Sequence, residues 1–499
     1  MRLHPTDCRR GLTTGLLALG FFAASQTLQA QAPTFQVTQN FSGFFNIGNS
    51  GFIPPDTMGA VGPTQYGELV NGGYGIFSKT GAVTSTTTDL AFWQAAGLTT
   101  AAAKGVFDPR LQYDAGSGHW YASELASASN ASTTSSGTDN QILVAVSKSS
   151  DLTQGFTGYA FDTVKGTTKN YFADFDTLGV NANGVYVGLN NFDSSGAGLA
   201  VSALAIDKAS LIAGTPVSNL SYNVDYSTTG FTPHPVTDSG TDTTAYFLSD
   251  YNVASGGLAV SAITGTTGTL TGSGQNVTAA AYADPPGGAF QDTQQGTATQ
   301  IDGGDTRFSG SVIKVGNIIY GVQSVQDPGS GALQDIRLVG INATTKATVL
   351  DQLISNTDLN YSYPSLAINA SGKVVIGFSS VGALQYISGN AIVGQLNAAG
   401  NAVIFGNPVT LAAGLSTYDS TFGGAANRWG DYSSTTIDPT NPNKFWTIQE
   451  YASATDEWST NISEITVDAV PEASSALGFG LLLTLGGAAV VIRKRRAKA

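Results

Sequence analysis

Hydrophobic and polar residues alternate along most of the chain, in short runs separated by glycine, asparagine and aspartate. Residues 181–184 (Asn-Ala-Asn-Gly) stand between the apolar runs 178–180 and 185–187. Residues 370–373 (Ala-Ser-Gly-Lys) separate two further runs in the same way. Period-two alternation interrupted by such residues predicts antiparallel strands joined by tight hairpins. One segment differs, because residues 89–104 begin with Asp89 and follow helical spacing, which predicts one short helix.

A longer unit repeats through the body of the chain. It begins with an Asp- or Pro-containing segment, continues into an apolar strand and a turn, and ends with a strand rich in aromatic residues. A four-stranded sheet fits into about 60 residues, and radial sheets leave only short edges. We therefore predict an all-β, seven-bladed β-propeller over residues 31–470, with six or eight blades if a weaker unit is misplaced. The units begin near residues 56, 108, 174, 235, 306, 364 and 431.

Ring closure has two candidate strands, an early one at Phe35–Thr38 and a late one at Ile462–Val467. The sequence does not decide between them.

The repeated units resemble a family of secreted bacterial β-propeller proteins, which are distantly similar to sialidase-type propellers. This resemblance implies the fold and says little about activity. The matching stretches are Pro55–Pro63 with Val70-Asn71, Asp108-Pro109 with Tyr113-Asp114, Asp174–Phe192, Pro364–Gly377 and Arg428–Tyr451.

The N-terminal segment predicts a secretory signal peptide over residues 1–30. Three arginines precede a short apolar run, residues 16–24, and small Ala30 stands at the expected cleavage site. The run is too short to span about 30 Å of hydrocarbon. Signal peptidase would remove the single cysteine, Cys8, so that the mature chain has no thiol chemistry.

The C-terminal segment, residues 471–499, predicts a membrane-associated sorting signal. The motif Pro471-Glu472-Ala473 precedes an apolar stretch, residues 476–492, which predicts a transmembrane helix, and a basic tail, residues 493–498. A plain tail anchor would have a similar apolar stretch and basic end. The order resembles the PEP-CTERM signal of bacterial surface proteins, although Ala473 replaces its usual second proline. This resemblance implies transient anchoring in the inner membrane and processing by an exosortase. The basic stop consists of Arg493, Lys494, Arg495 and Arg496.

Charge is scarce and unbalanced. Charged residues make up 11% of the chain and its formal net charge is −13. Without the two end segments, 14 basic residues face 33 acidic ones, which gives residues 31–470 a net charge of −19. Because like charges repel, we expect no nucleic-acid partner.

Most familiar catalytic constellations are missing from the sequence. The body contains only His119 and His234, both interpreted as structural residues, and it has no G-x-S-x-G elbow or Walker loop. A sialidase-like glycoside hydrolase is the one enzyme alternative, since such propellers clamp an anionic sugar with three arginines. Its candidate residues are Arg110, Arg307 and Arg428. Pairing of each arginine with a nearby aspartate is the structural alternative.

Aspartates recur near the unit starts and would suit calcium if they ring the mouth of a central channel. Turn formation by the side chain is the structural alternative, and it is the stronger explanation for any single aspartate. The chain therefore needs no cofactor, although calcium would fit. These residues are Asp56, Asp108, Asp174, Asp305 and Asp431.

Together these patterns predict an exported protein of the cell surface or extracellular matrix that acts as a non-catalytic binding or structural protein, with an enzyme acting on polysaccharide as the alternative. Its expected partners are an extracellular polysaccharide or a surface protein.

Overall fold

The computed structural model describes residues 32–468, apart from 128–139, 164–171, 193–197, 224–225, 228, 253–256, 277–281, 283–284, 286–288, 327–332 and 421–426. The predicted signal peptide and sorting signal both lie outside these residues. Residues 32–470 group into one unit by their contacts. Within the described part of the chain, no helix has the length and apolar character needed to cross a membrane.

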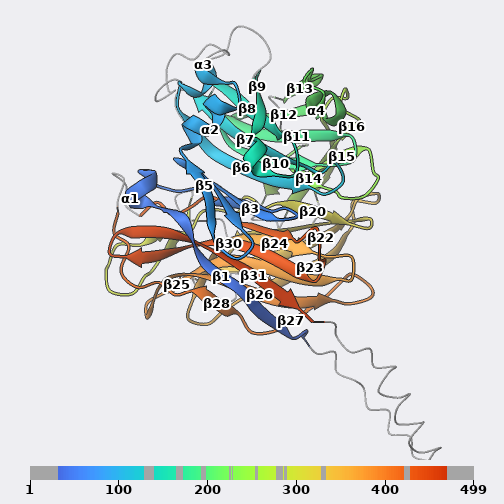
Figure 1. The fold of residues 1–499 in the computed structure, drawn as a ribbon. Helices are drawn as coiled ribbons and strands as arrows, with labels where there is room; N and C mark the ends of the chain where they lie inside the picture. The colour runs from blue at the N-terminus through green and yellow to red at the C-terminus, as the bar shows by residue number, and fades with distance from the viewer. Residues whose placement is uncertain are drawn as a thin grey trace, which may run out of the picture. The chain divides into compact units, whose positions relative to one another are not determined.

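The expectation of an all-β chain is confirmed (Figure 1). Antiparallel sheets of four strands follow one another along the sequence, each strand pairing with the next. The first three sheets contain β2 (Met58–Val61), β3 (Gln65–Val70), β4 (Gly73–Ser78) and β5 (Val83–Thr87); β6 (Val106–Asp114), β7 (His119–Ser127), β8 (Asn140–Ser147) and β9 (Phe156–Asp162); and β10 (Phe172–Val180), β11 (Gly184–Phe192), β12 (Gly198–Asp207) and β13 (Ser218–Asn223).

The next eight strands form one continuous sheet. Its two antiparallel halves meet where Val236 and Thr237 pair in parallel with Val312 and Ile313. The halves are β14 (Phe231–Thr237), β15 (Thr244–Asn252), β16 (Gly257–Thr264) and β17 (Thr271–Asn276); and β20 (Val312–Val315), β21 (Ile318–Val325), β22 (Asp335–Asn342) and β23 (Thr348–Ile354).

The last two large sheets complete the chain. A separate hairpin pairs β18 (Gln291–Asp292) with β19 (Ile301–Asp302). The large sheets contain β24 (Asn360–Ile368), β25 (Lys373–Gly382), β26 (Gln385–Leu396), β27 (Val403–Phe405) and β28 (Val409–Ala412); and β29 (Ser434–Ile437), β30 (Lys444–Ala454), β31 (Glu457–Val467) and β1 (Phe35–Asn46).

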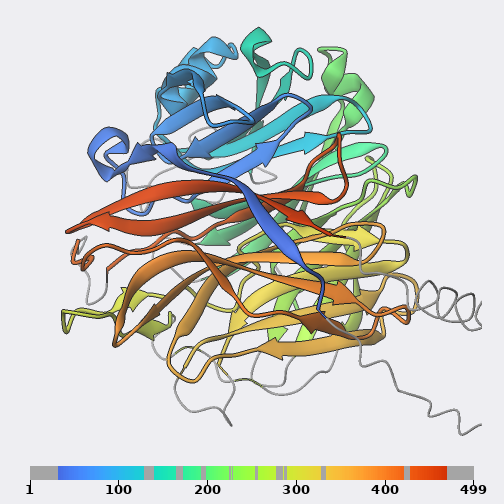
Figure 2. The same ribbon diagram turned by 60° about the horizontal axis from the view of Figure 1, so that its bottom comes forward.

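Both candidate closing strands take part in closure, and they pair with each other. Phe35 is the register partner of Val467, and the antiparallel pairing continues to Asn46 and Ser459. Figure 2 shows β1, in blue, running alongside the red β31. The first strand of the chain is therefore the outermost strand of the last sheet.

Short helices occupy the connections. The single helix expected over residues 89–104 is wrong in detail, because Gly97 breaks it with a φ of 101°. The helical segments are α1 (Ile47–Ser50), α2 (Asp89–Ala95), α3 (Thr99–Ala102), α4 (Lys208–Ile212) and the 3₁₀ turn η1 (Leu152–Gln154).

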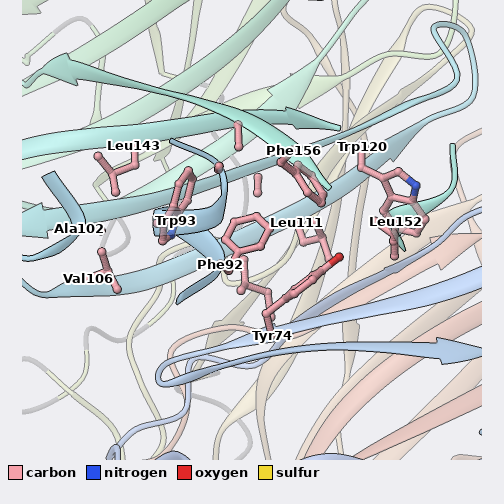
Figure 3. Close-up of a cluster of buried hydrophobic side chains, with 14 of the residues drawn as sticks. Tyr74, Phe92, Trp93, Ala102, Val106, Leu111, Trp120, Leu143, Leu152 and Phe156 are labelled. Carbon is pink, nitrogen blue, oxygen red and sulfur yellow. The ribbon is translucent and has the colours of Figure 1, made fainter. Parts of the chain in front are cut away.

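Hydrophobic clusters lie between consecutive sheets. In Figure 3, Tyr74 of the first sheet and Phe92 of α2 pack with Leu111, Trp120 and Phe156 of the second sheet. Similar clusters join each following sheet to its successor. A final cluster joins Trp446 in the last sheet to Tyr66 in the first. Four-stranded sheets packed in sequence and closed end to end are the architecture of a β-propeller.

Aspartate and asparagine side chains end the first strand of several sheets. Asn181 Oδ1 accepts hydrogen bonds from the N–H groups of Asn183 and Gly184, both at 2.9 Å. Asn369 Oδ1 accepts them from Ser371 and Lys373, both at 3.0 Å. These side chains fix the turns that the sequence pattern predicts.

Candidate functional site

A left-handed residue recurs near the start of the first strand of several sheets. Each lies six residues before the residue that opens the following turn. Non-glycine residues rarely adopt this conformation, and the strand pairing is interrupted by a bulge at most of these positions. The residues and their φ angles are Asp56 (49°), Asp108 (61°), Phe175 (54°), Thr232 (56°) and Tyr363 (49°).

Two of these residues, Asp56 and Asp108, are linked through Asn71. The Asn71 side-chain amide donates to Asp56 Oδ2 at 2.6 Å, and Asn71 Oδ1 accepts from the Asp108 N–H at 3.0 Å. The Asp56 carboxyl also accepts from the Asp431 N–H at 3.1 Å. The starts of β6 and the last sheet therefore converge on the segment that precedes β2.

The Asp108 carboxyl extends this network to two aromatic residues. Its Oδ2 accepts from the Phe175 N–H at 3.0 Å and from the Tyr432 hydroxyl at 2.8 Å. The rings of Phe175 and Tyr432 meet edge to face, with centroids 4.8 Å apart. Together with the neighbouring arginines described next, these aspartates and aromatic residues form a group that we call the axial cluster. Its members are Asp56, Asp108, Asp174, Asp176, Asp302, Asp305, Asp431, Arg110, Arg307, Arg428, Phe175 and Tyr432.

Arg110 lies inside the axial cluster and is only 2% exposed. Its guanidinium carbon lies 3.4 Å from the centroid of the Tyr432 ring. Nε donates to the Asp176 carbonyl at 2.8 Å and Nη1 to the Ser309 carbonyl at 3.0 Å. Arg110 thus binds the backbone of β10 and of the segment that precedes β20, and it stacks on the ring of Tyr432, which precedes β29, whereas the structural alternative anticipated a carboxylate partner.

The other two candidate arginines pair with aspartates as the structural alternative predicts. Arg307 contacts both carboxyl oxygens of Asp305 at 2.8 to 2.9 Å, and its guanidinium carbon lies 4.0 Å from the Phe175 ring centroid. Arg428 donates to Asp431 at 2.9 Å and lies 3.7 Å from Asp302. Arg110 and Arg307 both lie over the ring of Phe175, with guanidinium carbons 5.6 and 4.0 Å from its centroid.

Burial and mutual repulsion disturb the carboxyl groups of the axial cluster. Burial raises the pKa of Asp56 well above its usual range, and the nearby Asp431 and Asp108 raise it further. Burial, followed by Asp108, raises the pKa of Asp174 to about 7. Burial raises the pKa of Asp176 to about 8 against the opposing effects of Arg110 and Ser123. The cluster therefore retains protons close to neutral pH.

Among the described residues, no group of three or more His, Cys, Asp or Glu side chains is placed to hold a metal ion. Four of the five aspartates expected at a channel mouth nevertheless lie close enough to influence one another. Asp56, Asp108, Asp174 and Asp431 interact electrostatically, while Asp305 joins them through Arg307.

The two histidines lie apart from each other. His234 is fully buried in β14, where Nδ1 contacts the Pro235 carbonyl at 3.1 Å. Burial, and then Arg110, lower the pKa of His234 to about 3, so the imidazole is neutral. His119 is partly exposed at the start of β7. Within the described residues, neither imidazole is hydrogen-bonded to a serine, threonine or cysteine side chain that it could activate.

Partly exposed aromatic residues lie next to the axial cluster, and we call them the aromatic row. They are Phe107, Phe172, Phe192, Phe231 and Tyr226. Phe107 stacks on Phe172, with ring centroids 5.7 Å apart, and Phe172 is the strand partner of Phe192. Phe192 contacts Phe231 at 5.8 Å, and Phe231 contacts Tyr226 at 5.6 Å. Three successive sheets thus contribute to one continuous line of rings.

Sequence reasoning missed Asn71, Phe175, Asp176 and Tyr432, and it did not identify the aromatic row. One usable signal was the constant spacing of six residues before each turn-forming residue, which aligns Phe175 and Tyr432 with Asp108.

No protein-family model matches the chain, and no curated protein does so. Several solved structures match the chain at low sequence identity. A sialidase mutant from Trypanosoma rangeli with trans-sialidase activity has a TM-score of 0.34 and 10% identity, covering 71% of this chain and 53% of its own, so the match spans about half of that protein. The Dos1 propeller has a TM-score of 0.34 and 11% identity, covering 87% and 95%. An α-L-arabinofuranosidase from Fusarium graminearum has a TM-score of 0.36 and 9% identity, covering 72% and 93%.

Proposed function

We propose that the protein is an exported, seven-bladed β-propeller that binds an extracellular polysaccharide without cleaving it. The aromatic row is the observation that carries this proposal. Aromatic ring faces provide apolar contact for the C–H faces of sugars, and a row of rings suits an extended chain of sugars. Loops and edges of a rigid propeller are well placed for such recognition.

The number of blades is supported by the strand pairing. Dividing the eight-stranded sheet at the parallel pair between β14 and β20 leaves seven antiparallel units, counting β1 with the last. The hydrophobic cluster between the last and first units supports a closed ring.

The absence of catalysis is proposed from the state of the arginines. A carboxylate-binding clamp needs guanidinium donors that face the ligand. Arg110 is buried against Tyr432 and two backbone carbonyls, while Arg307 and Arg428 are paired with Asp305 and Asp431. The sialidase-like hydrolase is therefore the weaker candidate.

The route to the cell surface is proposed from the two ends of the chain. Signal peptidase would act after Ala30, and an exosortase would recognise Pro471-Glu472-Ala473 and the basic stop that follows. The C-terminal segment would hold the protein in the inner membrane before release to the cell surface or matrix. Mass spectrometry of the exported protein tests this route, which predicts a C-terminus near Pro471; an intact tail in the envelope would contradict it.

Binding is tested on a glycan array with the protein purified as the cell exports it. We expect retention of one class of oligosaccharide, and weaker retention by the Phe172→Leu variant, which keeps an apolar side chain but loses the ring. Retention of no glycan at all would contradict the proposal.

A further inference from the structure

The aromatic row and the axial cluster are continuous along the strands that contain them. Asp108 directly follows Phe107, and Asp174 lies two residues after Phe172. The register partner of Phe231 is Asp250, and Tyr251, which follows Asp250, is 36% exposed. A sugar chain lying on the aromatic row would therefore have carboxyl groups beside it.

The axial cluster is richer in carboxyl groups than in guanidinium groups. Two of its three arginines are matched by Asp305 and Asp431. The other carboxyl groups are balanced by Arg110, by the longer contact of Arg428 with Asp302 at 3.7 Å and by the attraction of Arg307 for Asp174. One oxygen of the fully buried Asp176 has no hydrogen-bond partner within the described residues. The carboxyl groups are those of Asp56, Asp108, Asp174, Asp176, Asp302, Asp305 and Asp431.

This imbalance favours a cationic occupant over an anionic one. Asp174 is partly exposed, and the repulsion from Asp108 and Asp431 acts on it against the attraction of Arg307, so that it retains a proton up to about pH 7. A positive group beside Asp174 would favour the release of that proton, whereas a carboxylate or sulfate would add to the repulsion. Arg428 is the most exposed arginine of the cluster, with 42% of its side chain exposed, and Asp431 already neutralises it.

We infer that the polysaccharide is one that carries free amino groups, whose sugar faces stack on the aromatic row and whose ammonium groups lie beside Asp174. This inference rests on the proposed function and adds the chemical class of the ligand. It also distinguishes the protein from any propeller that binds an acidic sugar.

The test compares four oligosaccharides of equal length by calorimetry with the exported protein. These are a β-1,4-linked glucosamine oligomer, its fully N-acetylated form, a neutral cello-oligosaccharide and an oligogalacturonate. We expect the glucosamine oligomer to bind at least about tenfold more tightly than either neutral oligomer, with a preference that weakens as salt rises. The oligogalacturonate should not bind.

Two variants connect this preference to the structure. Asp174→Asn should lower the affinity for the glucosamine oligomer about tenfold and reduce its advantage over the cello-oligosaccharide. Phe172→Leu should weaken binding of both oligomers. Asp468→Asn makes the same charge change at the opposite end of the strands, beside Thr34, and should leave binding unchanged. Circular dichroism verifies that each variant is folded.

The outcomes distinguish the two claims. Equal affinity for glucosamine and cello-oligosaccharides, both sensitive to Phe172→Leu, would overturn the amino-sugar inference while supporting polysaccharide binding. A preference for the oligogalacturonate would also overturn it. Binding of none of the four, or binding insensitive to Phe172→Leu in a folded variant, would contradict the proposed surface itself. An Asp174→Asn variant with full preference for glucosamine would overturn the assignment of Asp174.

Discussion

At the scale of single residues, the axial cluster shows that side chains which look functional in the sequence serve the architecture. Arg110 stands at a unit start, as a ligand-binding arginine would, yet it connects the backbone at Asp176 and Ser309 and stacks on Tyr432. The sequence predicts that an arginine occurs near an aspartate. It does not specify a carbonyl 199 positions away as the partner.

Alanine substitutions at the arginines separate a structural role from a catalytic one. Arg110→Ala should lower the free energy of unfolding by about 3 kcal/mol, since it removes a buried cation–π contact and leaves two carbonyls without donors. Arg428→Ala should lower it by less than about 1 kcal/mol, because that ion pair is partly exposed. Urea unfolding measures both values. Loss of a measurable glycan-cleaving activity in folded Arg307→Ala or Arg428→Ala would favour the hydrolase instead.

Gly188 in β11 marks a close approach between neighbouring sheets. A Cβ atom there would lie 1.7 Å from the Pro233 carbonyl oxygen, which belongs to β14. Gly188→Ala should therefore force the two strands apart and lower the free energy of unfolding by about 2 to 3 kcal/mol. Gly406→Ala is the matched control, since the nearest atoms there lie 3.7 Å away. Similar melting temperatures for the two variants would contradict this packing.

At the scale of elements, strand alternation and turn residues were sufficient to predict the hairpins. Asn181 and Asn369 fix turns that the sequence marks clearly. Pairings between distant segments were not predictable in this way. The union of β14 with β20 depends on how two sheets approach each other, and closure by β1 on β31 joins strands from opposite ends of the chain.

Lysines from neighbouring sheets reinforce the turn ends of these strands. Lys208, which follows β12, contacts Asp114 of β6 at 2.8 Å, and Lys314 of β20 contacts Asp238, which follows β14, at 2.7 Å. Each of these two ion pairs joins one four-stranded unit to the next.

Glu68 connects the first sheet to the closing strand and should make closure depend on pH. This fully buried carboxyl accepts from the Phe44 N–H at 3.1 Å and from the Thr460 hydroxyl. Burial raises the pKa of Glu68 to about 7. The folded state therefore keeps a proton that the unfolded chain releases near pH 4.5. As a result, the free energy of unfolding should fall by about 3 kcal/mol as pH rises from about 4.5 past 7.

The Glu68→Gln variant removes this ionisation and keeps an oxygen that can accept the Phe44 hydrogen bond. We expect the free energy of unfolding of this variant, measured with urea, to fall less between pH 5 and pH 8 than that of the natural chain, by about 3 kcal/mol. Asp174 and Asp176 still titrate in both proteins. The informative quantity is therefore the change, between the two proteins, in the slope of the free energy of unfolding against pH. Glu457→Gln, at an exposed position on β31, should leave the slope unaltered. An unchanged slope in Glu68→Gln would contradict the assignment.

At the scale of the whole molecule, the sequence predicted the propeller from its repeat, and the candidate site only in part. The unit starts identified Asp56, Asp108, Asp174 and Asp431, which the fold does bring together. The aromatic row was not predictable, because its members come from three sheets and alignment in sequence does not reveal their contacts. A body with a net charge of −19 and a row of partly exposed rings is consistent with a neutral or cationic glycan as partner.

The central claim is that the protein binds polysaccharide and leaves it intact. The most direct test incubates the purified protein with an insoluble polysaccharide that retains it and measures bound protein and newly released reducing ends in the same sample. We predict that the protein sediments with the polysaccharide, that Phe172→Leu sediments less, and that reducing ends stay at the level of a protein-free control. Release of reducing ends in proportion to protein, abolished in folded Arg307→Ala or Arg428→Ala, would contradict the account.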